Sequence, residues 1–220
     1  SSTTDFAYIV DGHQQNVSLF GDTNLGGGLI DELILSRAMA ASRDQKALEA
    51  VFEESPAWRS YCELEARRLK ESYFLDEEKW AEAPLCRTLT VCYDEPLALE
   101  LSIGGASIRK MVEQPIPALG GRSFVGCLKD ALCAAVEVSR SCPPEVVILT
   151  GGASRMAFFQ QACREAFADA LVVLCPEPEC SIARGLAYAG RVDERLKTFR
   201  QEVASIAHGE KLSVAVNASA

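Results

Sequence analysis

Residues 145–156 read EVVILTGGASRM, and this stretch decides the fold class. Its apolar run predicts a buried strand, its glycine pair predicts a turn, and the residues from Ser154 to Phe167 have the apolar spacing of a helix. The run LVVLC at 171–175 predicts a second buried strand, and a further helix is expected from Ser181. Strands that alternate with helices in this way are typical of an α/β fold.

Two hairpins are predicted upstream of this stretch. Residues 5–10 and 15–20 flank Asp11-Gly12, a dipeptide that suits the positive φ angles of tight hairpin turns. Apolar residues also alternate over 89–93 and over 97–103, around an Asp-Glu-Pro turn. An alternation with a period of two predicts strands that bury one face.

A helix-rich block separates the two hairpins. Residues 30–38 carry apolar side chains at helical spacing, and Ser55-Pro56 suits the start of a second, longer helix. We therefore expect an α/β core formed by residues 1–28 and 104–190, and a helix-rich α+β insertion with a β-hairpin at 29–103. Residues 191–220 are expected to form a C-terminal helix and tail. The apolar residues of that last helix recur at heptad-like spacing: Val192, Leu196, Phe199, Val203 and Ile206.

The composition excludes several kinds of partner. The 220 residues carry a formal net charge of -9, with no clustering of Lys and Arg, so nucleic acid is not expected as a partner. No run reaches the roughly 20 apolar residues that a membrane helix needs. Nine cysteines without any C-x-x-C pair, and without a signal peptide, favour a reducing cytoplasm. Because Ser1 resembles a cut site more than a natural start, we expect the chain to be a fragment.

Three glycine- or hydroxyl-rich turns fall at the boundaries of predicted elements. They are residues 1–5 (SSTTD), 21–28 (GDTNLGGG) and 151–155 (GGASR). Glycine allows the backbone to approach a phosphate closely, and exposed N–H groups at a helix start attract anions. Each turn alone is weak evidence, and neither a Walker nor a Rossmann glycine pattern is present.

In combination these segments resemble the DnaK-type heat-shock chaperones of the actin-like ATPase superfamily. SSTTDFAYIVDG and GDTNLGGG resemble the family's Gly-Gly-Thr-Phe-Asp phosphate strand and its Gly-Asp-Thr-His-Leu-Gly-Gly motif. VVILTGGASRM resembles its Val-Gly-Gly-Ser-Thr-Arg adenosine motif, and PECSIARGLAYAG resembles its Pro-Asp-Glu-Ala-Val-Ala-Tyr-Gly helix start. The resemblance covers residues 1 to about 190. It implies an α/β, ribonuclease-H-like lobe, the second of the two in that fold, with the insertion described above.

The resemblance also implies an adenine-nucleotide site. Residues matched to contacts with the phosphates and ribose are Ser1, Ser2, Thr3, Gly26, Gly27, Gly151, Gly152 and Ala153. Residues matched to contacts with the adenosine are Glu65, Arg68, Ser72, Arg155 and Glu179. The i, i+3, i+7 spacing of Glu65, Arg68 and Ser72 independently puts them on one helix face. The chain departs from the family where serines replace two phosphate-loop glycines, where Gly28 replaces a glutamate and where Leu69 replaces a basic residue.

ATP or ADP is the cofactor that the resemblance implies, with magnesium in the intact protein. The expected partners are the adenine nucleotide, the missing first lobe, and protein clients or co-chaperones. Phosphoryl transfer needs charge stabilisation from both sides of the cleft, so this lobe alone is expected to bind nucleotide without hydrolysing it. Two alternatives remain open, an actin-like filament or scaffold protein and a nucleotide-sensing pseudoenzyme.

Overall fold

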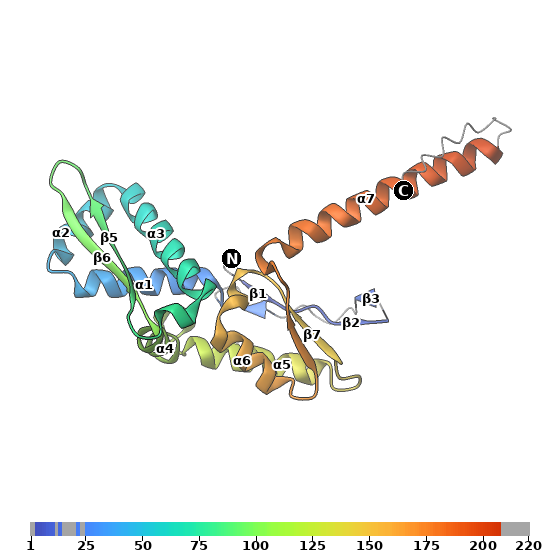
Figure 1. Ribbon diagram of the computed structural model, residues 1–220, viewed down its shortest axis with the longest axis horizontal. Coiled ribbons are helices and arrows are strands. Elements are labelled where there is room, and N and C mark those ends of the chain that lie inside the picture. The colour runs from blue at the N-terminus through green and yellow to red at the C-terminus, as the bar shows by residue number, and fades with distance from the viewer. Residues whose placement is uncertain (1–2, 12, 15–20, 23–24, 208–220) are drawn as a thin grey trace. The chain divides into compact units, whose positions relative to one another are not determined.

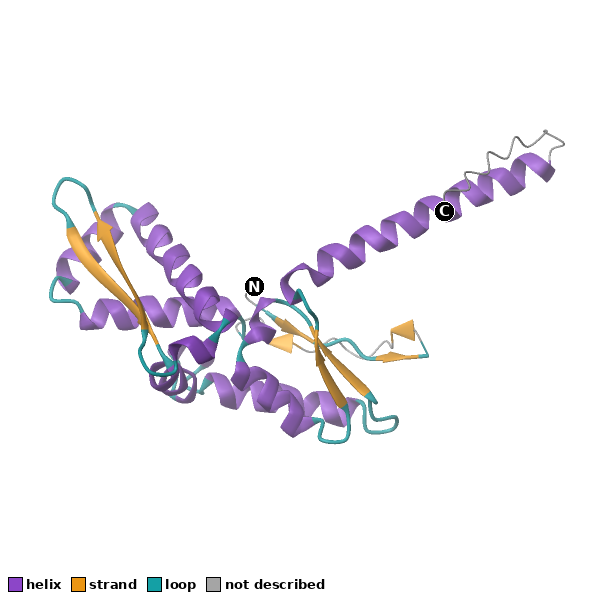
Figure 2. Ribbon diagram, viewed as in Figure 1, coloured by secondary structure: helices purple, strands orange, loops and turns teal. Residues whose placement is uncertain are grey.

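The computed structural model describes residues 3–11, 13–14, 21–22 and 25–207. It is a mixed α/β structure with many helices and four two-stranded sheets in its described part (Figure 1, Figure 2). The chain divides into two compact units, Ser1–Pro178 and Glu179–Ala220. Over the described residues, no helix combines the length and the apolar character that crossing a membrane requires.

Every strand that the structure describes belongs to the first unit. Its elements are β1 (Thr4–Asp5), β2 (Ile9–Val10), β3 (His13–Gln14), β4 (Gly21–Asp22), α1 (Gly27–Ala41), α2 (Gln45–Glu54), α3 (Pro56–Leu75), η1 (Glu77–Trp80), β5 (Leu85–Val91), β6 (Leu97–Ile103), α4 (Gly105–Glu113), η2 (Pro117–Leu119), α5 (Phe124–Val138), β7 (Val146–Leu149), η3 (Gly152–Arg155), α6 (Ala157–Ala166) and β8 (Leu171–Leu174). The η elements are short 3-10 helices.

The first predicted hairpin forms its turn where expected. Val10 of β2 pairs with His13 of β3, and Asp11, which follows Val10, has a positive φ of 50°. The strand predicted over 5–10 is interrupted, because its start belongs to β1, which pairs with β4 instead. The partner strand predicted at 15–20 lies outside the described residues.

The segment expected as an insertion contains the helices and the hairpin that the helical spacing and the alternation predict. β5 and β6 form a seven-residue antiparallel ladder in which Leu89 faces Leu99. Leu89, Val91, Leu99, Leu101 and Ile103 are buried, which confirms the buried face of this hairpin. α1 and α3 pack against each other and against β6, so the hairpin and the two helices share one core.

β7 and β8 form a parallel pair connected through α6. The helix after the glycine turn begins at Ala157 rather than at Ser154, because the intervening residues form η3 first. The prediction that both strands are buried is wrong for one face of this sheet. Alternate residues of the two strands are exposed: Val146, Ile148, Leu171 and Val173.

The second unit is described through α7 (Ser181–Ala207). The helix expected from Ser181 is present, and it continues without interruption through the boundary that we expected at 190/191. Residues 191–207 are therefore the later part of one helix and not a separate element.

Candidate functional site

Two of the predicted glycine turns meet in the first unit. Gly27 is the first residue of α1, and the turn after β7 carries Ala153. A Cβ added to Gly27 would lie 4.0 Å from the Ala153 Cβ and 3.9 Å from the Met156 Cε. Gly26 and Gly27 are buried, whereas Gly152 is exposed. The structure thus brings residues 26–27 and 151–153 together, and the second group is the more accessible one.

Residues 151–155 form a rigid turn. Gly151 has φ 79° and ψ 151°, and its N–H donates to the Pro178 carbonyl at 2.7 Å. The buried Ser154 hydroxyl donates to the Gly151 carbonyl at 2.7 Å. The half-buried Arg155 donates from Nη2 to the Pro176 carbonyl at 3.5 Å. The guanidinium therefore lies beside the chain that leaves β8, at the rim of the turn.

A buried ion pair supports the start of α1. The Lys70 Nζ of α3 lies 2.6 Å from Asp31 Oδ1 of α1, and it donates to the Gly27 carbonyl at 2.7 Å. Both side chains are about nine-tenths buried. Burial raises the pKa of Asp31 above its ordinary value, although the Lys70 ammonium opposes that shift. The pair fixes α3 against the first turn of α1, directly behind Gly27.

Glu65 and Arg68 belong to a different cluster from the glycine turns. The buried Glu65 carboxylate accepts a hydrogen bond from Arg68 Nη1 at 2.5 Å, and another from Arg87 of β5. Ser72 is exposed one turn further along α3. Because Lys70 and Ser72 are two residues apart, they point about 160° apart around the helix. Glu65 and Arg68 are thus joined to the β5–β6 hairpin, while Lys70 faces α1.

The two arginines beside Glu65 shift the pKa of its carboxyl group. Burial favours the protonated acid, but hydrogen bonds from Arg87 and Arg68 outweigh it and lower the pKa below the ordinary value. A lowered folded-state pKa gives stability that is present above the unfolded pKa, about 4.3, and is lost as the pH falls through the folded value.

Replacing Glu65 with glutamine should reduce the free energy of unfolding by roughly 1–2 kcal/mol at pH 7, because the negative charge is lost and only one of the two acceptor oxygens remains for Arg68 and Arg87. In denaturant titrations, the gap between wild type and variant should shrink as the pH falls below about 4. Glu71, whose ion pair with Arg67 is exposed, is the matched control, and Glu71→Gln should cost well under 1 kcal/mol. If the stability difference between wild type and Glu65→Gln stayed constant down to pH 3, the lowered pKa of Glu65 would be contradicted.

The remaining predicted residues belong to the start of the chain and to the first residue of the second unit. Thr3 is exposed, and its hydroxyl donates to Asp5 Oδ2 at 3.0 Å. The neighbouring Thr4 hydroxyl donates to the Leu25 carbonyl, which ties this strand to the approach of α1. Ser1 and Ser2 lie outside the described residues. Glu179 begins the second unit and is described with that unit only.

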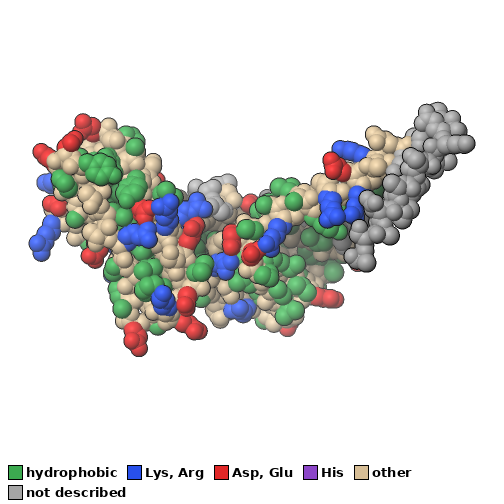
Figure 3. Space-filling view, turned by 45° about the horizontal axis from the view of Figure 1, so that its top comes forward, with side chains coloured by type: hydrophobic (Ala, Val, Ile, Leu, Met, Phe, Trp, Pro, Cys, Tyr) green, Lys and Arg blue, Asp and Glu red, His purple; other side chains and the backbone are tan. Residues whose placement is uncertain are grey.

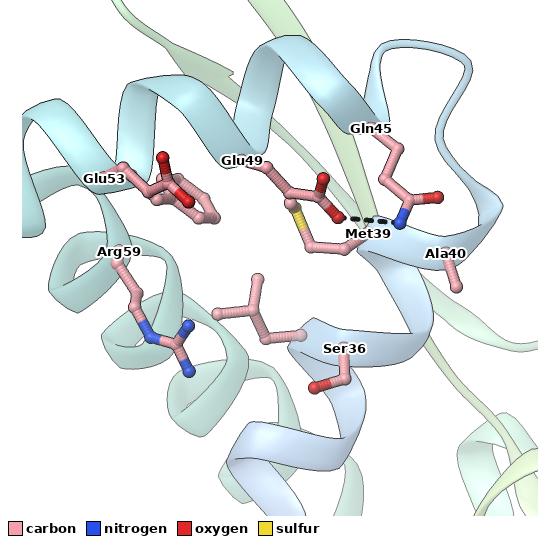
Figure 4. Close-up of a pocket in the computed structure, with 9 residues that line it drawn as sticks. Ser36, Met39, Ala40, Gln45, Glu49, Glu53 and Arg59 are labelled. Carbon is pink, nitrogen blue, oxygen red and sulfur yellow. Dashed lines mark hydrogen bonds between the residues drawn. The ribbon is translucent and has the colours of Figure 1, made fainter.

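The pocket drawn in Figure 4 contains none of the predicted site residues. It encloses about 350 Å³ between α1, α2 and the start of α3. Figure 4 shows the polar rim formed by Gln45, Glu49, Glu53 and Arg59, with Gln45 Nε2 donating to Glu49 Oε1 at 2.8 Å. The pocket belongs wholly to the insertion, so it gives no support to a ligand at the glycine turns.

Sequence reasoning missed Lys70. The available signal was a lysine on the apolar stripe of α3, between Leu69 and Tyr73, together with Asp31 on the apolar stripe of α1. Two opposite charges on two buried stripes predict a pair when the helices are neighbours, because buried charges are normally paired. The pattern did not reveal that the helices are neighbours.

Across the described ranges, no group of three or more His, Cys, Asp or Glu side chains is placed to hold a metal ion. No protein-family model matches the chain, and no curated protein matches it either.

Proposed function

We propose that this chain binds an adenine nucleotide as the second lobe of a DnaK-type, actin-like ATPase. The observation that carries the proposal is the close approach of Gly27 to Ala153, whose Cβ lies 4.0 Å from the position that a Cβ on Gly27 would occupy. These residues belong to two motifs that are far apart in the sequence and that resemble the phosphate and adenosine motifs of that family. Motifs that bind one ligand must lie together, and these two do.

The chemistry of the junction fits a phosphorylated ligand with an aromatic base. Gly152 is exposed, so the backbone can be approached there without a side chain in the way. Arg155 follows on the same turn, and a guanidinium can stack on the face of a purine. The β7–α6–β8 unit is the parallel arrangement that α/β nucleotide-binding folds share.

This chain alone is not expected to hydrolyse ATP. Transfer of a γ-phosphoryl group depends on positioning and on charge stabilisation around the whole phosphate. Within the family that the sequence resembles, the other lobe supplies half of those groups and magnesium accompanies the phosphates. This lobe is therefore expected to hold the nucleotide and to contribute the adenosine contacts.

Replacing Arg155 with alanine should weaken ADP binding by about 1–2 kcal/mol, which is the size of a partly desolvated contact between a cation and an aromatic face. Binding of pyrophosphate should change much less, because pyrophosphate has no base. Isothermal titration calorimetry of both ligands, with wild type and variant, measures the difference directly.

Arg140 provides the control, because it is an exposed arginine just after α5 that pairs with Glu137. Arg140→Ala should leave both affinities unchanged. If wild type does not bind ADP at all, the proposed function is wrong. Equal losses for ADP and pyrophosphate would show instead that Arg155 contacts phosphate and does not stack on the purine.

A further inference from the structure

α7 presents a seam of residues at heptad spacing. Steps of three and four residues alternate along the seam, which gives the mean spacing of 3.5 residues that coiled coils require. The large side chains in it are well exposed, with Ile182 at 69%, Leu196 at 47% and Phe199 at 61%. Hydrophobic and charged side chains share the surface of the described part of this helix (Figure 3). The seam is formed by Ile182, Gly185, Ala189, Val192, Leu196 and Phe199.

The two smallest residues of the seam lie on one side of its centre. Gly185 and Ala189 lie in its first half, whereas Leu196 and Phe199 lie in its second half. A parallel copy would set Gly185 against Gly185 and leave a gap, because equivalent seam residues face each other in a parallel pair. An antiparallel copy sets Gly185 against Leu196, so that the smallest residue of the seam faces a large one, and it sets Ile182 against Phe199.

Charge favours the same orientation. Arg195 and Arg200 flank the seam, and in a parallel pair Arg195 of one helix would face Arg200 of the other. Like charges at these positions oppose pairing. In the antiparallel pair Arg195 faces Tyr188 of the second copy, which allows a cation–π contact.

We propose that α7 is a self-association surface, and that its occupant is the α7 of a second copy of this chain, running antiparallel. The seam is self-complementary about its centre, between Gly190 and Arg191, as a two-fold symmetric interface must be. This inference is independent of nucleotide binding, which we assign to the first unit.

Sedimentation equilibrium of the whole chain over a range of concentrations tests the proposal. A concentration-dependent equilibrium between monomer and dimer is expected. Leu196→Glu should raise the dissociation constant at least about tenfold, since it would bury a carboxylate in the seam. Leu196→Ala should weaken the dimer while favouring the helix, so a loss of pairing cannot be attributed to unfolding. Gln201→Glu adds the same carboxylate on the outer face of α7 and should leave the dimer unchanged.

Arg195→Glu tests the orientation. It removes the contact with Tyr188 and should weaken an antiparallel dimer, whereas it would pair with Arg200 and strengthen a parallel one. A wild-type chain that remains monomeric at every concentration would overturn the proposal. A dimer whose dissociation constant is unchanged by both substitutions of Leu196 would also overturn it. A dimer that Arg195→Glu makes tighter would overturn the antiparallel arrangement.

Discussion

Replacing Lys70 with methionine is expected to lower the free energy of unfolding by about 3–5 kcal/mol, because it strands the Asp31 carboxylate in the interior without its partner. Burial already raises the pKa of Asp31, and the Lys70 ammonium is the nearest group that favours its charged form. The Gly27 carbonyl would lose a buried hydrogen bond from Lys70 Nζ as well. Urea denaturation followed by circular dichroism measures the loss.

Two further variants test whether the loss of stability comes from leaving the buried Asp31 carboxylate unpaired. The double variant Lys70→Met with Asp31→Leu removes both charges and should recover most of the stability, since apolar residues of similar size replace many buried pairs without loss. Lys129 pairs with Glu165 at 3.7 Å on the surface, so Lys129→Met is the matched control and should cost less than about 1 kcal/mol. A loss below 1 kcal/mol for Lys70→Met would mean that the pair contributes little to the fold.

The second large effect is expected from Phe124→Ala, at about 3–5 kcal/mol. Phe124 is almost completely buried in α5, and its ring meets Phe158 of α6 edge to face at 5.9 Å. Phe158 in turn meets Phe74 of α3 at 6.4 Å. This row of rings joins the helices beside β7 and β8 to the insertion, so a cavity at Phe124 should loosen both sides of the Gly27–Ala153 junction.

Denaturant unfolding gives the stability change of Phe124→Ala, and hydrogen exchange shows where protection is lost. Faster exchange is expected in α3 as well as in α5 and α6. Leu75 is the control, because it ends α3 with 71% of its surface exposed, and Leu75→Ala should change the stability by no more than about 0.5 kcal/mol. Faster exchange confined to α5 would show that the row of rings does not connect the two parts.

The elements with strict periodicity were predictable from the sequence. The β5–β6 hairpin follows from its alternation, because one buried face forces a period of two along both strands. α3 begins at Pro56 with Ser55 as its N-cap residue, as the local sequence predicts, whereas α1 begins at Gly27, inside its glycine-rich turn. These features depend on residues that are neighbours in the sequence, so the sequence alone predicts them.

The features that depend on packing between distant elements were not predictable. The spacing of Glu65, Arg68 and Ser72 fixes their common helix face, but it does not reveal that Arg87 of β5 lies against Glu65. An apolar run such as VVIL cannot distinguish a strand covered on both faces from one covered on a single face, so the exposure of Ile148 was missed. Lys70 was missed because its partner Asp31 lies on another helix.

The backbone of Gly151 limits which amino acids evolution can place there. Its φ of 79° with ψ of 151° falls outside the left-handed helical region that asparagine and aspartate tolerate, in a region that is essentially restricted to glycine. No atom lies within 4 Å of a Cβ added at this position, so backbone strain alone imposes the restriction. Every single-base change of a glycine codon that alters the amino acid without creating a stop codon introduces a Cβ. Each such mutation at codon 151 would therefore strain the turn, whichever side chain it encodes.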